Sequence, residues 1–282
     1  MNSFTKSPFT VGTVLSNLVS QAQLRRAWQD IRDGWRLHRL WGTMGMQDIR
    51  QRYRRSKIGP FWLTISMGVT IGALGILYGA LFKIDIANFL PYVAAGFVIW
   101  GLLSGLLLDS AKSFISAEGL IRQLSVPLSV HVFRDIWRNL LIFAHNIWIY
   151  VAVSLWFGAF PGPMALLALV GVALLAFNAL WLGLLLGLLS ARFRDIPQII
   201  ASIVQVTFFV TPIIWKADML PGRSFVLEFN PFFHFLDIVR GPLLGHYPTL
   251  FTWGAVLFMT CAGWLLTIVI YAKYRWRIAY WV

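Results

Sequence analysis

Six long apolar runs, separated by shorter polar stretches, divide most of the chain. A helix needs about 20 mostly apolar residues to cross a hydrocarbon core about 30 Å thick, and each run reaches that length. Pro161 and Pro163 stand in the short gap between the third and fourth runs, which predicts a hairpin there. The pattern predicts an all-α integral membrane protein with six transmembrane helices, at 59–82, 89–108, 139–158, 164–190, 196–215 and 251–272.

Lysine and arginine are unequally divided between the two sides that these spans define. Twenty of the 24 lie in residues 1–58, 109–138, 191–195 and 273–282, and four lie on the other side. Because cytoplasmic loops of membrane proteins collect Lys and Arg, we expect both termini to be cytoplasmic. The chain then divides into a cytoplasmic N-terminal region (1–58), a six-span domain (59–272) and a cytoplasmic tail (273–282).

The N-terminal region contains two unusual stretches. Apolar residues in 22–41 recur at helical spacing with arginines beside them, a pattern typical of an amphipathic helix in the membrane interface. A helix docked on a soluble subunit is the alternative. In the stretch 49–62, five cations stand before the first span, where they can hold it near anionic lipid headgroups.

Composition limits the classes of function. The chain is 58% hydrophobic and 12% charged, with a mean hydropathy of +0.70, whereas soluble domains carry about 25% charged residues. The net charge of +13 would by itself suggest a nucleic-acid partner. Too little polar surface is left to display that charge, so we expect no such partner. Cys261 is the single cysteine, which excludes an intramolecular disulfide.

None of the eleven Asp and Glu residues falls within the six predicted spans. Ion-coupled transporters usually bury a carboxylate where the coupling ion binds, so this pattern disfavours that class. The chain also lacks the GxxxxGK[ST] phosphate loop of a P-loop ATPase. Energy for transport is therefore expected to come from another subunit.

Two spans carry patterns that each have two possible meanings. Glycines on one face of the first span, namely Gly68, Gly72, Gly75 and Gly79, either allow close helix contact or line a smooth conduit. Amides, hydroxyls and rings in the fifth span suit either sugar binding or a polar bundle interior. The residues considered there as channel lining are Gln205, Phe208, Phe209 and Trp215.

The outer segment 216–250 is too apolar for an open loop and too broken to span. Asn230 before Pro231 predicts a helix start, and Gly241-Pro242 predicts its end. We expect re-entrant or interfacial short helices here, because irregular backbone at membrane depth must be buried or line a wet cavity. The residues proposed for an outer gate are Asn230, Pro231, Phe232 and Phe233.

The inner segment 109–138 is moderately polar. Glu118, Gly119 and Arg122 lie in its middle, and Pro127 lies near its end. The segment suits either a short helix presented to a cytoplasmic partner or an ordinary solvated connector.

Five stretches, in this order, resemble the permease subunit of type-2 ATP-binding-cassette exporters: RYRRSKIGPFW, SAEGLIRQLSVPLSV, ARFRDIPQII, TPIIW and NPFFHFLDIVRGPLLGHYP. Within that family, the likeness is to the branch that exports bacterial surface polysaccharides, namely lipid-linked O-antigens, capsules and teichoic acids. The likeness extends over nearly all of the chain from residue 45 onward.

The resemblance implies a homodimer in the bacterial inner membrane, joined by two copies of a separate ATPase subunit that binds ATP and Mg²⁺, with no cofactor or metal in this chain. It assigns to ATPase contact Ser116, Ala117, Glu118, Gly119, Leu120 and Arg122 of the inner loop, and Arg192, Arg194 and Asp195 before the fifth span. It also implies an entrance for a pyrophosphate-linked lipid at Arg52, Tyr53, Arg54, Arg55 and Ser56. These cations could equally serve only to anchor the topology.

The resulting hypothesis is ATP-driven export of a lipid-linked polysaccharide, most specifically O-antigen, with no covalent chemistry in this chain. The same scaffold exporting capsule, teichoic acid or a small molecule is one alternative. A membrane-embedded glycosyl- or acyltransferase is another, and it would need a paired acid and base. His131 with Asp135 is the inner candidate for such a pair.

Overall fold

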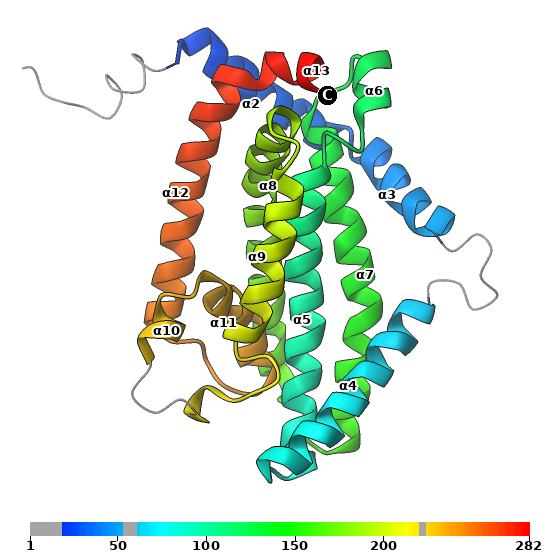
Figure 1. Cartoon of the computed structure of the whole chain (residues 1–282), viewed down its shortest axis with the longest axis vertical. Coiled ribbons are helices and arrows are strands. Elements are labelled where there is room, and N and C mark those ends of the chain that lie inside the picture. Colours follow the sequence, from blue (N-terminus) through cyan, green and yellow to red (C-terminus); the bar gives the residue numbers. More distant parts are fainter. Residues whose placement is uncertain (1–18, 53–60, 220–223) are drawn as a thin grey trace, which may run out of the picture.

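The computed structural model describes residues 19–52, 61–219 and 224–282, which form a bundle of long helices with shorter ones at its ends (Figure 1). These residues contain no β-strand, so the predicted all-α class is confirmed. α2, α6 and α13 lie together at one end of the bundle. The elements, in chain order, are α2 (Gln21–Arg36), α3 (His38–Arg52), α4 (Phe61–Phe82), α5 (Ile86–Lys112), α6 (Glu118–Gln123), α7 (Ser129–Trp156), η1 (Gly162–Leu166), α8 (Leu167–Arg192), α9 (Ile196–Val210), η2 (Ala217–Met219), α10 (Ser224–Glu228), α11 (Pro231–Leu243), α12 (Leu250–Tyr274), η3 (Arg275–Arg277) and α13 (Ile278–Trp281).

Five helical stretches within the described residues are long and apolar enough to cross a membrane: Thr64–Phe82, Ile86–Lys112, Ser129–Trp156, Gly162–Arg192 and Leu250–Trp281. The fifth predicted span, 196–215, needs correction, because it is helical only over the 15 residues of α9. The ring of Pro212 disfavours helical backbone at the residue before it, and Thr211 is extended, with φ −88° and ψ 135°. Six full spans therefore stay a prediction.

α5 and α7 run further toward the α2 end than the apolar pattern predicted. α5 continues to Lys112 rather than 108, and α7 begins at Ser129 rather than 139. Asp109 and Asp135 consequently lie inside helices of spanning length, contrary to the expectation that no acidic residue does. A span predicted from hydropathy ends at the first charged residue. The helix itself can continue through that residue when an oppositely charged side chain pairs with it.

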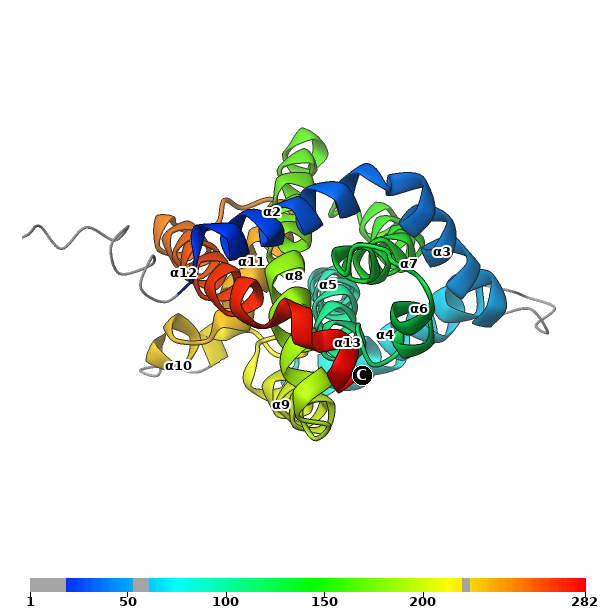
Figure 2. The ribbon, with the colours of Figure 1, turned by 90° about the horizontal axis from the view of Figure 1, so that it is seen from above.

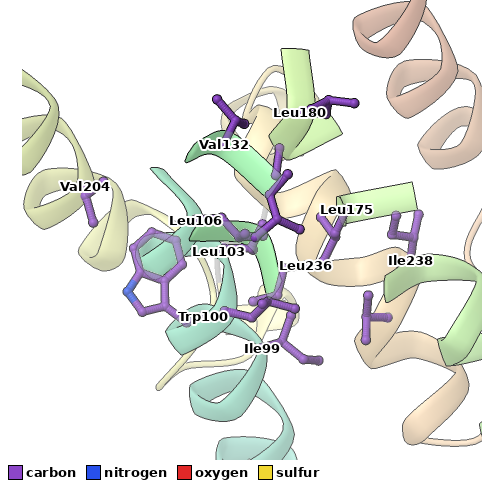
Figure 3. Packing of buried hydrophobic residues seen from close by; sticks show 14 of the residues in the cluster. Ile99, Trp100, Leu103, Leu106, Val132, Leu175, Leu180, Val204, Leu236 and Ile238 are labelled. Carbon is purple, nitrogen blue, oxygen red and sulfur yellow. The ribbon is translucent and has the colours of Figure 1, made fainter. Parts of the chain in front are cut away.

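α5 is the central helix and contacts α4, α7, α8, α9 and α11 (Figure 2). The close approach of α7 to α8 depends on Gly183, where a Cβ would lie 2.3 Å from Cγ1 of Val132. Side chains from α5 and the helices around it form the buried core. They include Ile99, Trp100, Leu103 and Leu106 of α5, Leu175 and Leu180 of α8, and Leu236 and Ile238 of α11 (Figure 3).

α2 lies across the end of the bundle (Figure 2), and Asp30 anchors it there. The buried Asp30 carboxylate accepts hydrogen bonds from the backbone N–H groups of Leu128 and Ser129, at 3.1 and 3.0 Å, where α7 begins. It also accepts one from the Tyr271 hydroxyl at 2.9 Å and pairs with Arg275 at 2.9 Å. Asp30 therefore links α2 to α7 and to the end of α12.

The predicted amphipathic helix 22–41 is divided in two. α2 ends at Arg36, and Leu37 interrupts the helix with a ψ of 33° before α3 begins. One face of α2 is buried against the bundle, whereas Trp28 and Trp35 stay more than half exposed although their rings contact other helices. A position of α2 in the membrane interface stays a prediction.

Candidate functional site

The predicted ATPase-contact residues of the inner loop lie on or beside α6 at the α2 end (Figure 1). No residue of α6 is buried. Glu118 and Arg122 form an ion pair at 2.9 Å on its surface. Ala117 differs, because it is 2% exposed and therefore packs inside the protein. The remaining accessible residues of the predicted set are Ser116, Gly119 and Leu120.

The second predicted contact comprises Arg192, Arg194 and Asp195, all exposed at the turn between α8 and α9. The Arg194 guanidinium donates to the carbonyl of Trp281 at 3.1 Å, and the Arg192 guanidinium lies 5.6 Å from the centre of the Trp281 ring. From the other side, Arg122 of α6 donates to the carbonyl of Val282. α13 and Val282, which follows it, therefore join the two predicted contact segments, a role that sequence analysis missed because no motif marks these residues.

A partly buried ionic network lies between α3, α5 and α7. Arg138 pairs with Asp48 at 2.8 Å, with Asp109 at 2.9 Å and with Asp135 at 2.9 Å. Arg134 makes a two-pronged pair with Asp48. Sequence analysis missed this network, because its members come from three helices and 90 residues separate Asp48 from Arg138. The signal available was the i, i+4 spacing of Arg134 and Arg138 on one helix.

A polar cavity of about 410 Å³ opens beside this network and is also lined by Lys112 and Ser116. The cavity therefore adjoins the predicted coupling segment. Burial favours the protonated form of Asp48, but the hydrogen bond and charge of Arg134, with those of Arg138, outweigh burial and hold the pKa of Asp48 below its usual range. Asp48 is thus ionised at neutral pH, the state in which it can pair with two guanidinium groups.

The four glycines of α4 fall into two pairs with different surroundings. Gly75 and Gly79 are buried, and a Cβ on Gly75 would lie 2.2 Å from Cδ1 of Leu90 on α5. Gly68 and Gly72 have no atom within 4 Å of the corresponding position. The first pair supports helix packing. The second pair leaves an open face, for which channel lining stays a prediction.

The channel-lining candidates of the fifth predicted span are also divided. Gln205 and Phe209 lie one turn apart on the exposed side of α9. Phe208 is half-buried, and its ring centre lies 5.8 Å from that of Trp100 on α5. Trp215 lies beyond the helix, where its indole N–H donates to the carbonyl of Phe209 at 3.2 Å. Gln205 and Phe209 are therefore the two that remain accessible to a passing ligand.

The predicted gate residues Asn230, Pro231, Phe232 and Phe233 form the start of α11, away from the α2 end. The predicted helix start is confirmed, because the Asn230 side chain accepts from the N–H groups of Phe232 and Phe233 at 3.0 and 3.4 Å. Its amide donates to Thr211 Oγ1 at 3.0 Å, which ties α11 to the end of α9. The predicted end at Gly241-Pro242 is wrong by one residue, because α11 continues to Leu243.

The irregular stretch 211–215 between α9 and η2 has backbone carbonyls that side chains satisfy. The Tyr92 hydroxyl lies 3.0 Å from the carbonyl oxygen of Pro212 and 2.9 Å from that of Trp215. The Arg240 guanidinium donates to the Pro212 carbonyl as well and stacks 4.6 Å from the centre of the Tyr92 ring. Non-helical backbone at membrane depth needs such partners, and sequence analysis identified neither Tyr92 nor Arg240.

The predicted substrate entrance falls largely outside the described part of the chain. Tyr53, Arg54, Arg55 and Ser56 lie there. Arg52 ends α3, and its side chain also lies outside the described structure. The entrance role of these five residues stays a prediction.

His131 and Asp135 do not form the acid–base pair that an enzyme would need. The Asp135 carboxylate accepts from the Ser113 hydroxyl at 2.6 Å and pairs with Arg138. His131 is buried, and its Nδ1 has no hydrogen-bond partner among the described residues. Within the same residues, no three His, Cys, Asp or Glu side chains are placed to hold a metal ion.

Five helices of spanning length, with ionic networks at one end, define a multi-pass membrane protein. The chain belongs to the ABC-2 type transporter family, whose sequence profile matches residues 39–244. This confirms the resemblance drawn from the motifs. The protein is therefore a transport permease of the inner membrane.

Three relatives cover most of the chain. It is 23% identical to the O-antigen export system permease protein RfbA of Klebsiella pneumoniae over 241 residues, which is 83% of this chain and 91% of that protein. A second Klebsiella pneumoniae protein of the same name is 22% identical over 245 residues, with the same coverage. The protein of that name from Myxococcus xanthus is 21% identical over 204 residues, 71% of this chain and 78% of that protein.

Proposed function

We propose that this chain is the channel-forming subunit of an ATP-driven exporter whose cargo is a lipid-linked polysaccharide, most specifically O-antigen. The names of the three relatives support the cargo. The convergence of α6 and the 192–195 turn on α13 is the observation that carries the mechanism. It supports a single surface at which a cytoplasmic ATPase subunit can act.

A separate ATPase subunit, present in two copies, binds ATP and Mg²⁺ in this proposal. Its movement acts on the exposed residues of α6 and on Arg192, Arg194 and Asp195. α13 connects the displaced α6 to α8, and the Arg138 network connects α3, α5 and α7. Movement of α6 is thereby transmitted to helices that border the transport path.

The exporter contains two copies of the chain, with the channel between them. Support comes from the apolar side chains that α4 and α9 expose, which include Ile65, Val69, Ile76, Ile199, Ile203 and Val206. Gly68, Gly72, Gln205 and Phe209 lie on these two helices and would line the path of the sugar chain. The cations Arg52, Arg54 and Arg55 would bind the pyrophosphate of the lipid carrier.

Charge reversal at Glu118 tests this proposal. Glu118→Arg should insert normally but remove polysaccharide from the cell surface, while the purified complex continues to hydrolyse ATP. Asp33→Arg is the matched control. Asp33 is also an exposed acid one turn from an arginine, at 3.9 Å from Arg36, but it lies on α2 and should leave export unchanged.

Three results would contradict parts of the proposal. Normal surface polysaccharide in Glu118→Arg cells that contain normal amounts of the protein would exclude α6 from coupling. Export of a small molecule in place of the polysaccharide by the reconstituted complex would support the small-molecule alternative. Turnover of a lipid-linked sugar by the isolated chain would support a membrane enzyme.

A further inference from the structure

An aromatic cup lies beneath α2, between α7 and α8. It is a cavity of about 610 Å³ lined by Trp28, Arg32, Trp35, Trp41, Phe133 and Trp137, and by apolar side chains that continue to Leu140 of α7 and Ala173 of α8. Arg32 is the only charged residue in this described lining. The site thus combines one cation with an otherwise hydrophobic surface.

Contacts between aromatic rings fix the side chains at the opening of the cup. The Phe133 ring centre lies 5.6 Å from that of Trp35 and 5.8 Å from that of Trp41. The Trp41 ring in turn meets Trp137 edge-on, with centres 6.0 Å apart. Tryptophan rings concentrate at the boundary between lipid headgroups and acyl chains. These rings belong to the end of the bundle that α2 crosses, which fits that boundary.

The cup extends from α2 along the spanning helices. On α7 its lining runs from Phe133 to Leu140, and seven residues of helix rise about 10 Å. Leu180 and Ala173 line the same depth on α8, which runs in the opposite direction. The hydrophobic wall is therefore long enough to contact the upper part of an acyl chain but too short to enclose a whole lipid.

The charge at the mouth is positive and uncompensated. Arg32 is exposed and forms no ion pair within the described structure. Arg25, two turns earlier on the same side of α2, is likewise exposed and without an ion pair among the described residues. The free guanidinium group of Arg32 at the hydrophobic wall complements a phosphate that carries an acyl chain, and Arg25 adds positive charge on the same side of α2.

We propose that the aromatic cup binds one anionic phospholipid, with its phosphate against Arg32 and the upper part of an acyl chain against the wall formed by α7 and α8. The cup lies on the α2 side of the bundle, whereas α9, which carries channel-lining candidates, lies on the opposite side (Figure 2). The bound molecule is therefore a membrane lipid and not the exported cargo. It fills the space under α2 and stabilises the docking that Asp30 begins.

Native mass spectrometry of the full chain in detergent tests this site. Phosphatidylglycerol and phosphatidylcholine with identical acyl chains are titrated separately, and we expect one phosphatidylglycerol to be retained in preference. Arg32→Gln should weaken phosphatidylglycerol binding about fivefold, and Arg32→Lys should retain most of it. Arg26→Gln is the matched control, because it removes the same charge from a side of α2 that does not line the cup. It should leave binding unchanged.

A second pair of variants tests the acyl-chain contact. Ala176→Phe, on α8 inside the cup, should reduce the binding of both lipids. Val170→Phe places the same phenyl ring on an exposed part of α8 outside the cup and should have no effect. The melting temperature should rise on addition of phosphatidylglycerol to the wild type and Val170→Phe, and rise less for Arg32→Gln at the same lipid concentration. Melting curves without lipid establish that each variant is folded.

Three outcomes would overturn the proposal. Equal retention of the two lipids by the wild type would exclude selection by charge. Equal loss of phosphatidylglycerol binding in Arg32→Gln and Arg26→Gln would show that the lipid responds to the overall surface charge and not to Arg32. Displacement of phosphatidylglycerol by a polyprenyl diphosphate in the wild type but not in Ala176→Phe would make the cup a cargo site. Because binding is measured without transport, none of these results depends on the proposed export function.

Discussion

The two ends of the bundle are stabilised by different interactions. At the α2 end, full charges pair between helices, with Arg138 joining three carboxylates and Asp30 joining Arg275. At the α11 end, Tyr92 and Arg240 donate to backbone carbonyls of an irregular stretch. Separating partly buried ion pairs costs several kcal/mol, about 3–5 when one partner is removed, whereas a single hydrogen bond contributes about 1 kcal/mol. The α2 end is therefore expected to resist separation of its helices more strongly than the α11 end.

Arg138→Met gives the largest predicted effect. Its removal leaves Asp109 and Asp135 without their cation, so the free energy of unfolding should fall by about 3–5 kcal/mol. Denaturant unfolding in detergent measures this change. Arg36→Met is the control, because Arg36 is exposed and should change stability by about 0.5 kcal/mol or less. Equal losses of unfolding free energy in Arg138→Met and Arg36→Met would contradict the conclusion that the ion pairs of Arg138 stabilise the α2 end.

Asp30→Asn should destabilise less, by about 2 kcal/mol, because it weakens charge-assisted bonds from Tyr271 and Arg275. The single amide oxygen can still accept from one of the two N–H groups at the start of α7, which in Asp30 bind different carboxylate oxygens. Hydrogen exchange should accelerate in α2 and leave α11 unchanged. Acceleration in both helices would mean that Asp30 stabilises the whole bundle and not one end.

Tyr92→Phe should lower stability by only about 1 kcal/mol, since one hydroxyl is lost. Its effect on local opening should be clearer, with faster hydrogen exchange across 211–215 and no change in α2. Tyr247→Phe removes a hydroxyl from a side chain that is 76% exposed and serves as the control. No acceleration at 211–215 would show that Arg240 alone holds this stretch.

The pH dependence contributed by Asp48 is the smallest predicted effect. Because the pKa of Asp48 is lowered in the folded protein, its contribution is fully present above its unfolded pKa of about 3.9 and is lost as pH falls below that value. Unfolding midpoints from pH 5 to pH 3 should therefore decline less steeply for Asp48→Asn than for the wild type. Equal declines of the unfolding midpoint in the wild type and Asp48→Asn would contradict the conclusion that Arg134 and Arg138 lower the pKa of Asp48.

The fold could be predicted from sequence wherever apolar residues alone determine it. The hydrophobic runs located five spanning helices, and the Asn230-Pro231 pair located the start of α11. The ends of α5 and α7 on the α2 side could not be found this way, because Asp109 and Asp135 become acceptable in a helix only when Arg138 is beside them. Pro212 was a usable signal for the end of α9, since a residue before proline tends to leave the helix.

The candidate site was predictable only in part. Motif resemblance selected Glu118 and Arg194, but it did not indicate that α13 would lie between their segments. Asp30 also carried no signal, because its four partners lie 98 or more residues away along the chain. Contacts of this kind are determined by packing of distant helices, which a local pattern does not encode.

The shortness of α9 has a consequence for any solute that crosses the membrane beside it. Fifteen residues of helix extend about 22 Å, some 8 Å less than a hydrocarbon layer of about 30 Å. With one end of α9 at one face of this layer, the helix would end about 8 Å below the other face, where the segment beyond Val210 would support a hydrated depression. A hydrophilic polymer moving along this helix would contact water before it reached the headgroups of that face. Its path through the hydrocarbon layer would be shorter by about a quarter.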